Sequence, residues 1–202
     1  MKKNKISKDW ISKQHKDSYF KESKIRGYKS RSSFKLIEMN NKFKFLNQNT
    51  NLLDLGSSPG GWAQVAAEKI TKGKILAVDI RPMCKINNVK FLQGDLFDAA
   101  FYNQILTYFD KKIDVVISDM AADTTGNKNL DSFRTGELCL GAMGIAQKIL
   151  NKDGVFLSKL FMGSIFSEIH KKANKYFKKV INCKPLSSKK KSKEMYIYCK
   201  GI

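Results

Sequence analysis

Residues 51–62 read Asn-Leu-Leu-Asp-Leu-Gly-Ser-Ser-Pro-Gly-Gly-Trp, an apolar run that leads into a glycine-rich turn. The run Asn51–Gly56 predicts a short buried strand, and a helix is expected from about Gly61 to Ile70. Glycines in such a turn let the backbone bend sharply and approach a ligand closely. A strained turn that serves only packing is the alternative. Strand, turn and helix together are typical of the first unit of a doubly wound α/β sheet, whose ligands bind at the carboxyl ends of the strands.

Strands and helices are expected to alternate along the rest of the chain. Further strands are predicted at Lys74–Asp79, Val89–Asp95, Ile113–Asp119, Val155–Leu160, Lys179–Lys184 and Glu194–Lys200, with helices near 131–150 and 164–176. This alternation predicts an α/β fold with a mostly parallel, doubly wound sheet. Residues 7–27 and 31–43 predict two basic helices that are separated at Gly27. We therefore expect one domain over residues 1–202, with a basic N-terminal helical extension at 1–45 and a Rossmann-like core at 50–201.

The glycine-rich turn lacks the features that bind phosphates. A dinucleotide-binding G-x-G-x-x-G pattern would need glycine at position 58, where this chain has serine. The G-K-[ST] sequence of a P-loop is also missing from the turn. An NAD-dependent oxidoreductase is therefore disfavoured, and the turn predicts a nucleoside-like ligand that is held without phosphates.

Acidic residues lie at or near the ends of the first four predicted strands, at Asp54, Asp79, Asp95 and Asp119. Four such residues in order indicate a ligand that needs several hydrogen-bond acceptors. A carboxylate at the end of the second strand can accept both hydroxyls of a ribose, which is the role expected of Asp79. Asp95 would then lie beside the adenine of such a nucleoside.

Three charged residues stand out against their surroundings. Lys159 interrupts a strand that is apolar enough to be buried on both faces, so it must reach the strand end or serve the site. Glu194 is the only acid between Glu168 and the C-terminus, and Lys35 lies among apolar residues in the second predicted helix. Each residue alone also fits a structural or solvated side chain, but together with the turn they favour an active site.

The formal net charge of +20 is concentrated at the two ends of the chain. Residues 1–30 contain 10 Lys and Arg against 3 Asp and Glu, and residues 171–200 contain 11 against 1. A near-neutral body with two basic ends indicates a polyanion-binding surface, with nucleic acid as the leading candidate. A lysine-biased genome that places lysines at solvated positions is the alternative.

Cysteine usage and hydropathy limit the compartment and the class of site. The four cysteines are far apart and form no C-x-x-C pair, which argues against a zinc site and a disulfide framework and fits a reducing cytosol. The N-terminus is charged from its second residue, and no apolar run approaches the ~20 residues that span a bilayer. We expect a cytoplasmic protein without a metal and without a membrane partner.

Six stretches of the chain carry a family resemblance. They are Arg31–Leu36 (RSSFKL), Asp54–Trp62 (DLGSSPGGW), Val89–Asp95 (VKFLQGD), Ser118–Ala121 (SDMA), Lys159–Gly163 (KLFMG) and Ser187–Tyr196 (SSKKKSKEMY). In this order, and over nearly the whole chain, the sequence resembles the FtsJ family of ribosomal RNA 2′-O-methyltransferases. The resemblance implies a Rossmann-like class I S-adenosylmethionine-dependent methyltransferase fold, with a seven-stranded, mostly parallel sheet, helices on both faces and an N-terminal helical extension.

The resemblance also implies the site and its substrate. It implies a catalytic tetrad of Lys35, Asp119, Lys159 and Glu194, in which Lys159 is the base or the group that orients the hydroxyl. It implies that S-adenosylmethionine is bound by Gly60, Trp62, Asp79, Asp95 and Asp119, with Asp54 and Gly56 of the turn beside them. The implied substrate is a uridine ribose of large-subunit (23S) ribosomal RNA within a ribosomal particle, modified by a monomer.

Two alternatives and one departure from the family pattern accompany this interpretation. A similar tetrad occurs in ribose methyltransferases of messenger-RNA caps and of transfer RNA. A non-catalytic RNA-binding assembly factor on the same scaffold is the other alternative, although it would have no use for a lysine at 159. After Ser118–Ala121 the family continues Pro-Asn, whereas this chain has Ala122-Asp123. We expect this loop to hold the target nucleotide differently.

Overall fold

The computed structural model describes residues 17–189 and 191–202. At its centre is a seven-stranded sheet in the order β3-β2-β1-β4-β5-β7-β6. The strands are β1 (Leu52–Leu55), β2 (Ile75–Asp79), β3 (Lys90–Gln93), β4 (Ile113–Ser118), β5 (Leu150–Phe161), β6 (Lys179–Cys183) and β7 (Glu194–Lys200). The first five strands are parallel, whereas β7 is antiparallel to both β5 and β6. The predicted mostly parallel, seven-stranded sheet is confirmed.

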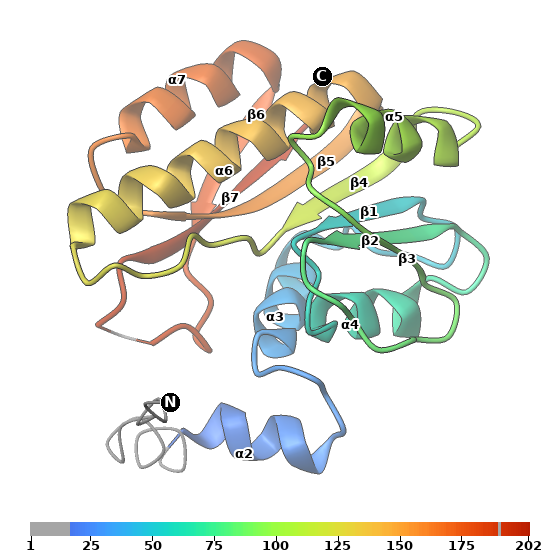
Figure 1. Ribbon diagram of the computed structural model, residues 1–202, viewed down its shortest axis with the longest axis horizontal. Coiled ribbons are helices and arrows are strands. Elements are labelled where there is room, and N and C mark those ends of the chain that lie inside the picture. Colours follow the sequence, from blue (N-terminus) through green and yellow to red (C-terminus); the bar gives the residue numbers. More distant parts are fainter. Residues whose placement is uncertain (1–16, 190) are drawn as a thin grey trace, which may run out of the picture.

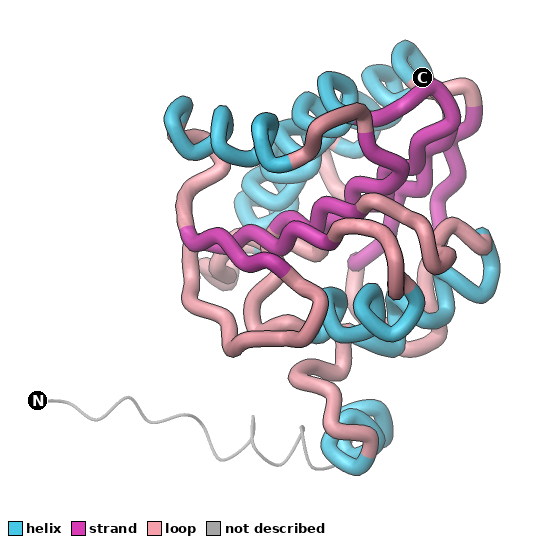
Figure 2. The backbone as a smooth tube through the Cα atoms, turned by 90° about the vertical axis from the view of Figure 1, so that its right-hand side faces the viewer, coloured by secondary structure: helices cyan, strands magenta, loops and turns pink. Residues whose placement is uncertain are grey.

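Helices cover both faces of the sheet (Figure 1). The helices of the described residues are α2 (Ser18–Ile25), α3 (Ser33–Phe43), α4 (Gly61–Lys69), α5 (Ala99–Tyr108), α6 (Lys128–Ile149) and α7 (Phe166–Tyr176). Helix α2 lies apart from the sheet and contacts α3. Helices α5, α6 and α7 pack on one face and α3 and α4 on the other, and Figure 2 shows the strands between the two layers. No helix among the described residues is long and apolar enough to cross a membrane.

The core explains why the early strands read as uninterrupted apolar runs. Leu52, Leu53 and Leu55 of β1 are fully buried, because helices cover both faces of this parallel sheet. Helix α3 joins the same core, with Leu36 and Met39 packed in one cluster with Leu52. The second helix of the predicted extension is therefore integral to the fold.

The strand order positions the site. From β1 the chain runs outward through β2 and β3, and it then returns to form β4 on the other side of β1. The carboxyl ends of β1 and β4 therefore flank the switch point of the sheet, where ligands bind in folds of this type. Leu55 of β1 is level with Ser118 of β4, so the glycine-rich turn and Asp119 follow side by side.

The structure differs from the sequence prediction in three places. Helix α5 was not expected, although Asp98 caps it by accepting a hydrogen bond from the Phe101 amide at 2.8 Å. Strand β5 begins at Leu150 rather than at Val155, with a register shift opposite β4. The first basic helix covers Ser18–Ile25, and residues 7–16 of that prediction lie outside the described residues.

Candidate active site at the switch point of the sheet

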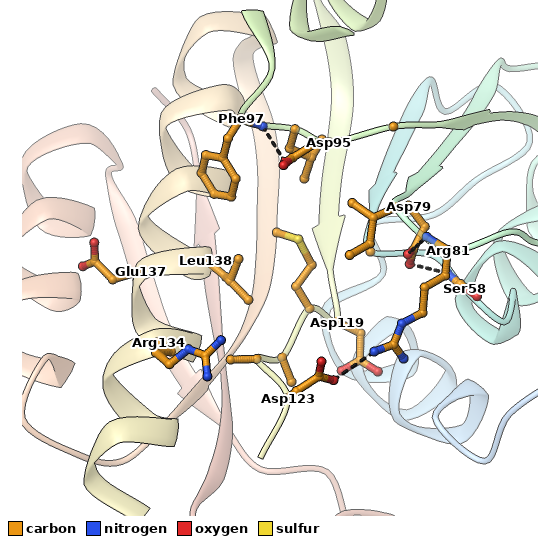
Figure 3. A pocket seen from close by; sticks show the side chains of 17 residues that line it. Ser58, Asp79, Arg81, Asp95, Phe97, Asp119, Asp123, Arg134, Glu137 and Leu138 are labelled. Atoms are coloured by element: carbon orange, nitrogen blue, oxygen red, sulfur yellow. Dashed lines mark hydrogen bonds and ion pairs between the residues drawn. The ribbon is translucent and has the colours of Figure 1, made fainter. Parts of the chain in front are cut away.

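The glycine-rich turn borders a cavity of about 640 Å³ at the carboxyl ends of the strands (Figure 3). Gly56 begins the turn with a φ of +75°, and a Cβ at this position would lie 2.2 Å from Cγ of Met120. Only glycine fits there without displacing the loop after β4. Six of the residues that line the cavity are Gly56, Ser58, Asp79, Asp95, Phe97 and Asp119.

Asp79 is oriented toward the cavity by the backbone around it. Its carboxylate accepts hydrogen bonds from the amides of Ser58 and Arg81, each at 2.8 Å. A carboxylate has about four acceptor positions, so Asp79 can still accept hydroxyl hydrogens from a ligand. Asp95 follows the end of β3 and is exposed. Its carboxylate accepts a hydrogen bond from the Phe97 amide at 2.9 Å.

Two apolar side chains in the cavity were missed by the sequence interpretation. Ile80 is 63% exposed and Phe97 is 66% exposed, although residues of this kind are usually buried. Both line the cavity beside the carboxylates of Asp79 and Asp95. A planar base bound near Asp95 would cover them, so the cavity suits a nucleoside.

The loop after β4 closes one side of the cavity. Here Asp123, one of the two residues that depart from the family pattern, pairs with Arg81 at 2.9 Å (Figure 3). Both side chains are mostly exposed, so this ion pair contributes little to stability. Among residues 17–189 and 191–202, no cluster of three or more His, Cys, Asp or Glu could hold a metal ion.

Three of the predicted cofactor residues lie behind the cavity instead of lining it. Asp54 is fully buried below the turn. Trp62 is 2% exposed, and its indole N–H donates to the Ser32 carbonyl at 2.9 Å. Gly60 has a φ of +110° at the start of α4. These three residues support the turn without lining the cavity. The predicted residues that do line it are Gly56, Asp79, Asp95 and Asp119.

The Asp54 carboxyl is unusual because neither of its oxygens has a hydrogen-bond partner in the described structure. Burial raises the pKa of Asp54 well above its ordinary value, and the nearby Asp119 and Asp79 carboxylates raise it further. The folded protein therefore binds this proton more tightly than the unfolded chain does.

We expect Asp54 to make the protein less stable as the pH rises. The free energy of unfolding should fall by up to about 1.4 kcal/mol per pH unit between the unfolded pKa, about 3.9, and the raised folded pKa. Asp54→Asn replaces the carboxyl with an amide that does not titrate, so it should remove this slope. Denaturant unfolding from pH 4 to 8 would measure the change. The exposed Asp153→Asn is the control and should leave the slope unchanged. Parallel curves for Asp54→Asn and the wild type would contradict the assignment.

The four predicted catalytic residues come together as two nearly buried ion pairs. Lys159 Nζ donates to the Asp119 carboxylate at 3.0 Å and to the Asp119 carbonyl at 2.8 Å. Lys35 Nζ lies 2.7 Å from one Glu194 oxygen and 2.8 Å from the other. The antiparallel pairing of β5 with β7 brings Lys159 and Glu194 together, since Lys159 is level with Tyr196 and Phe161 with Glu194.

Tyr196 links the two ion pairs and was not among the predicted residues. Its hydroxyl donates to the Asp119 carboxylate at 2.7 Å, and the Lys35 ammonium lies 5.7 Å from the centre of its ring. Burial and the nearby Asp119 and Glu194 carboxylates raise the pKa of Tyr196 well above its ordinary value, so it remains a neutral donor. One signal in the sequence could have identified Tyr196: it lies two residues after Glu194 in the same strand, and residues two apart in a strand share a face.

Asp119 connects the cavity with the tetrad. Burial acts to raise its pKa, but Lys159, Lys35 and the Tyr196 hydroxyl together lower the pKa below its ordinary value. Asp119 is therefore ionised, and it lines the cavity while it holds the Lys159 amine. The part of a ligand that reaches Asp119 would therefore lie next to the residue that holds the Lys159 amine.

Comparisons with known proteins identify the family of the chain. The family model of FtsJ-like methyltransferases matches residues 28–202. Ribosomal RNA large subunit methyltransferase E of Pelagibacter ubique is 44% identical over 200 residues, covering 99% of this chain and 98% of the relative. The enzyme of that name from Buchnera aphidicola is 41% identical, covering 97% and 96%.

Solved structures extend the comparison. A ribosomal RNA methyltransferase from Plasmodium falciparum superposes with a TM-score of 0.78 at 33% identity, covering 87% of this chain and 98% of that one. A Streptococcus mutans methyltransferase in complex with SAH has a TM-score of 0.54 at 12% identity, covering 85% and 96%, and shares the fold. The chain therefore belongs to the FtsJ-like methyltransferase family.

Proposed function

We propose that this protein methylates the 2′-hydroxyl of a uridine ribose in large-subunit ribosomal RNA, with S-adenosylmethionine as the methyl donor. The observation that carries the proposal is the Lys159–Asp119 pair at the inner edge of a cavity that suits a nucleoside. The names of the full-length relatives support ribosomal RNA as the substrate. The protein acts in the cytoplasm, on RNA within a ribosomal particle.

The cavity fits the proposed methyl donor. Asp79 would accept hydrogen bonds from the ribose hydroxyls of the cofactor. The adenine would lie beside Asp95 and would contact Ile80 and Phe97. At Gly56 the turn has no room for a side chain. The turn lacks phosphate-binding residues, which fits S-adenosylmethionine because this cofactor has no phosphates. When bound, S-adenosylmethionine supplies a methyl group that is made electrophilic by its sulfonium.

The tetrad supplies the groups that the RNA hydroxyl needs. Lys159 accepts the 2′-hydroxyl proton at Nζ or orients that hydroxyl, and a general base of this kind contributes ~10²–10⁴-fold. Asp119 holds the amine of Lys159, while Tyr196 fixes the carboxylate of Asp119. Lys35 and Glu194 pair with each other beside Tyr196, and they would help to position the ribose. Positioning supplies much of the remaining rate.

RNA affinity should depend steeply on salt because lysines contact the phosphates. Residues 1–16 contain six lysines and one aspartate. Deletion of residues 1–16 should weaken RNA binding, reduce the slope of log affinity against log salt, and leave S-adenosylmethionine affinity unchanged. Filter binding from 50 to 300 mM salt measures the RNA terms, and calorimetry measures the cofactor. Equal loss of both affinities would show that the segment belongs to the fold, and would contradict its role in RNA binding.

A substrate panel tests the proposed function. Purified protein and labelled S-adenosylmethionine would be incubated with unmethylated large subunits, free large-subunit RNA, transfer RNA and capped messenger RNA. The proposal predicts label in the large-subunit RNA, recovered as 2′-O-methyluridine. Label in transfer RNA or caps would favour those substrates, and binding of the particles without methyl transfer would favour an assembly factor.

A further inference from the structure

The loop between β6 and β7 is attached to helix α3 through a single carboxylate. We call residues 184–193 the lysine-rich loop; the structure describes all of them except residue 190. Glu38 of α3 accepts hydrogen bonds from two consecutive amides of this loop, Leu186 at 2.6 Å and Ser187 at 3.0 Å. Both bonds are charge-assisted, and together they fix the loop at one point.

The segment before α3 completes the attachment. The Arg31 guanidinium donates to the carbonyl of Ser187 and also pairs with Asp17. Both backbone groups of Ser187 are therefore satisfied by side chains of the N-terminal segment, and Ser187 is 1% exposed. A buried backbone needs such partners, so this contact determines where the loop runs.

The attachment continues into the tetrad. Ser188, the next residue, donates its hydroxyl to Glu194 at 2.8 Å, and Glu194 pairs with Lys35. Lys35 and Glu38 are three residues apart in α3 and therefore lie on neighbouring positions of one helix face. One face of α3 thus holds the lysine-rich loop and one half of the tetrad.

The same loop presents positive charge to solvent. Lys189, Lys191 and Lys193 are exposed, and none of them forms an ion pair with another described residue. Three exposed lysines near the nearly buried carboxylate of Glu194 suit the phosphate backbone of an RNA. Lys189 follows two residues after Ser187, which Glu38 and Arg31 hold, and Lys193 directly precedes Glu194 in the chain.

We infer that Glu38 is a positioning residue that couples RNA-backbone binding to the assembly of the tetrad. By holding Leu186 and Ser187, it places the loop lysines on the RNA and sets the carboxylate of Glu194 against Lys35. The inference rests on the proposed function, and it adds a residue that touches neither the RNA nor the methyl donor. Leu36 and Met39 already bury α3 in the core, so the helix does not depend on Glu38.

Glu38→Ala and Glu38→Gln test the inference, with the exposed Glu168→Gln in α7 as a control that removes the same charge. Glu38→Ala should lower the single-turnover rate at saturating RNA by about tenfold to a hundredfold, as expected when a reacting group is misplaced. It should also reduce the salt slope of RNA binding by roughly 0.7–0.9 for each phosphate contact that is lost. Glu38→Gln keeps one acceptor oxygen and should fall between Glu38→Ala and the wild type.

Three further measurements separate positioning from stability and from the proposed function. S-adenosylmethionine affinity should be unchanged in all three variants, thermal unfolding should show each of them fully folded at the assay temperature, and the amides of residues 186 and 187 should exchange faster only in the Glu38 variants. An active wild type together with an unchanged rate and salt slope in Glu38→Ala would overturn the inference. A wild type that methylates no RNA would overturn the proposed function instead, whatever the exchange experiment shows.

Discussion

Replacing Lys159 with arginine is expected to lower the single-turnover rate of methyl transfer by ~10²-fold or more. Lys159 is 8% exposed, and its amine is held by the carboxylate and the carbonyl of Asp119. Arginine would keep the positive charge, but a guanidinium stays protonated at any usable pH and cannot accept a proton. Lys159→Ala should lose a comparable amount, because it also lacks the accepting amine.

Two controls show whether the loss lies in the chemical step. Lys152→Arg changes an exposed lysine of the same strand and should be fully active. The affinities of the Lys159 variants for S-adenosylmethionine and RNA should equal those of the wild type. A fully active Lys159→Arg enzyme would exclude proton acceptance by Lys159 and leave positioning by Asp119 and Glu194.

The second large effect is expected at the methyl-donor cavity. Asp79→Ala should weaken S-adenosylmethionine binding by roughly 1.5–3 kcal/mol, the range for hydrogen bonds to a charged group. This corresponds to about a 10- to 150-fold rise in the dissociation constant. The amides of Ser58 and Arg81 would lose their acceptor as well, which loosens the turn. Calorimetry in the presence of a chelator measures the affinity and tests whether a metal is needed.

An exposed aspartate provides the control for Asp79. Asp153→Ala, at an exposed position in β5, should leave the dissociation constant unchanged. An Asp79→Ala protein that binds as tightly as the wild type would contradict the role of Asp79 as ribose acceptor. Failure of the wild type to bind S-adenosylmethionine at millimolar concentration would contradict methyl transfer altogether.

The sequence was sufficient to identify residues whose charge differs from that of the segment around them. Lys159 is a charge in an apolar strand and Glu194 an acid in a basic region, and the structure places both in the tetrad. The acids at the strand ends were expected at one edge of the sheet, and Asp79, Asp95 and Asp119 face one cavity there. Parallel strands with helical crossovers leave little freedom in this arrangement.

The rest depends on contacts between distant segments, which no local pattern encodes. Tyr196 reads as an ordinary strand aromatic until β5 and β7 pair in antiparallel register. Glu38 is half-buried and contacts residues about 150 positions away in the sequence, so its role required the fold. Asp54 shows the reverse, because the turn suggested a ligand contact while the structure places its side chain beneath the cavity.

The proposed activity is the methylation of a ribose hydroxyl in large-subunit RNA by S-adenosylmethionine, with the hydroxyl held at the tetrad. Its most direct test is a map of alkaline cleavage along that RNA in large subunits incubated with S-adenosylmethionine and either the wild type or Lys159→Ala. A 2′-O-methyl group removes the nucleophile that cleaves the adjacent phosphodiester bond. We predict that the wild type makes one linkage, on the 3′ side of a uridine, resistant to alkali, and that Lys159→Ala leaves it sensitive. Methyl incorporation without any alkali-resistant linkage would place the modification on a base and contradict the account.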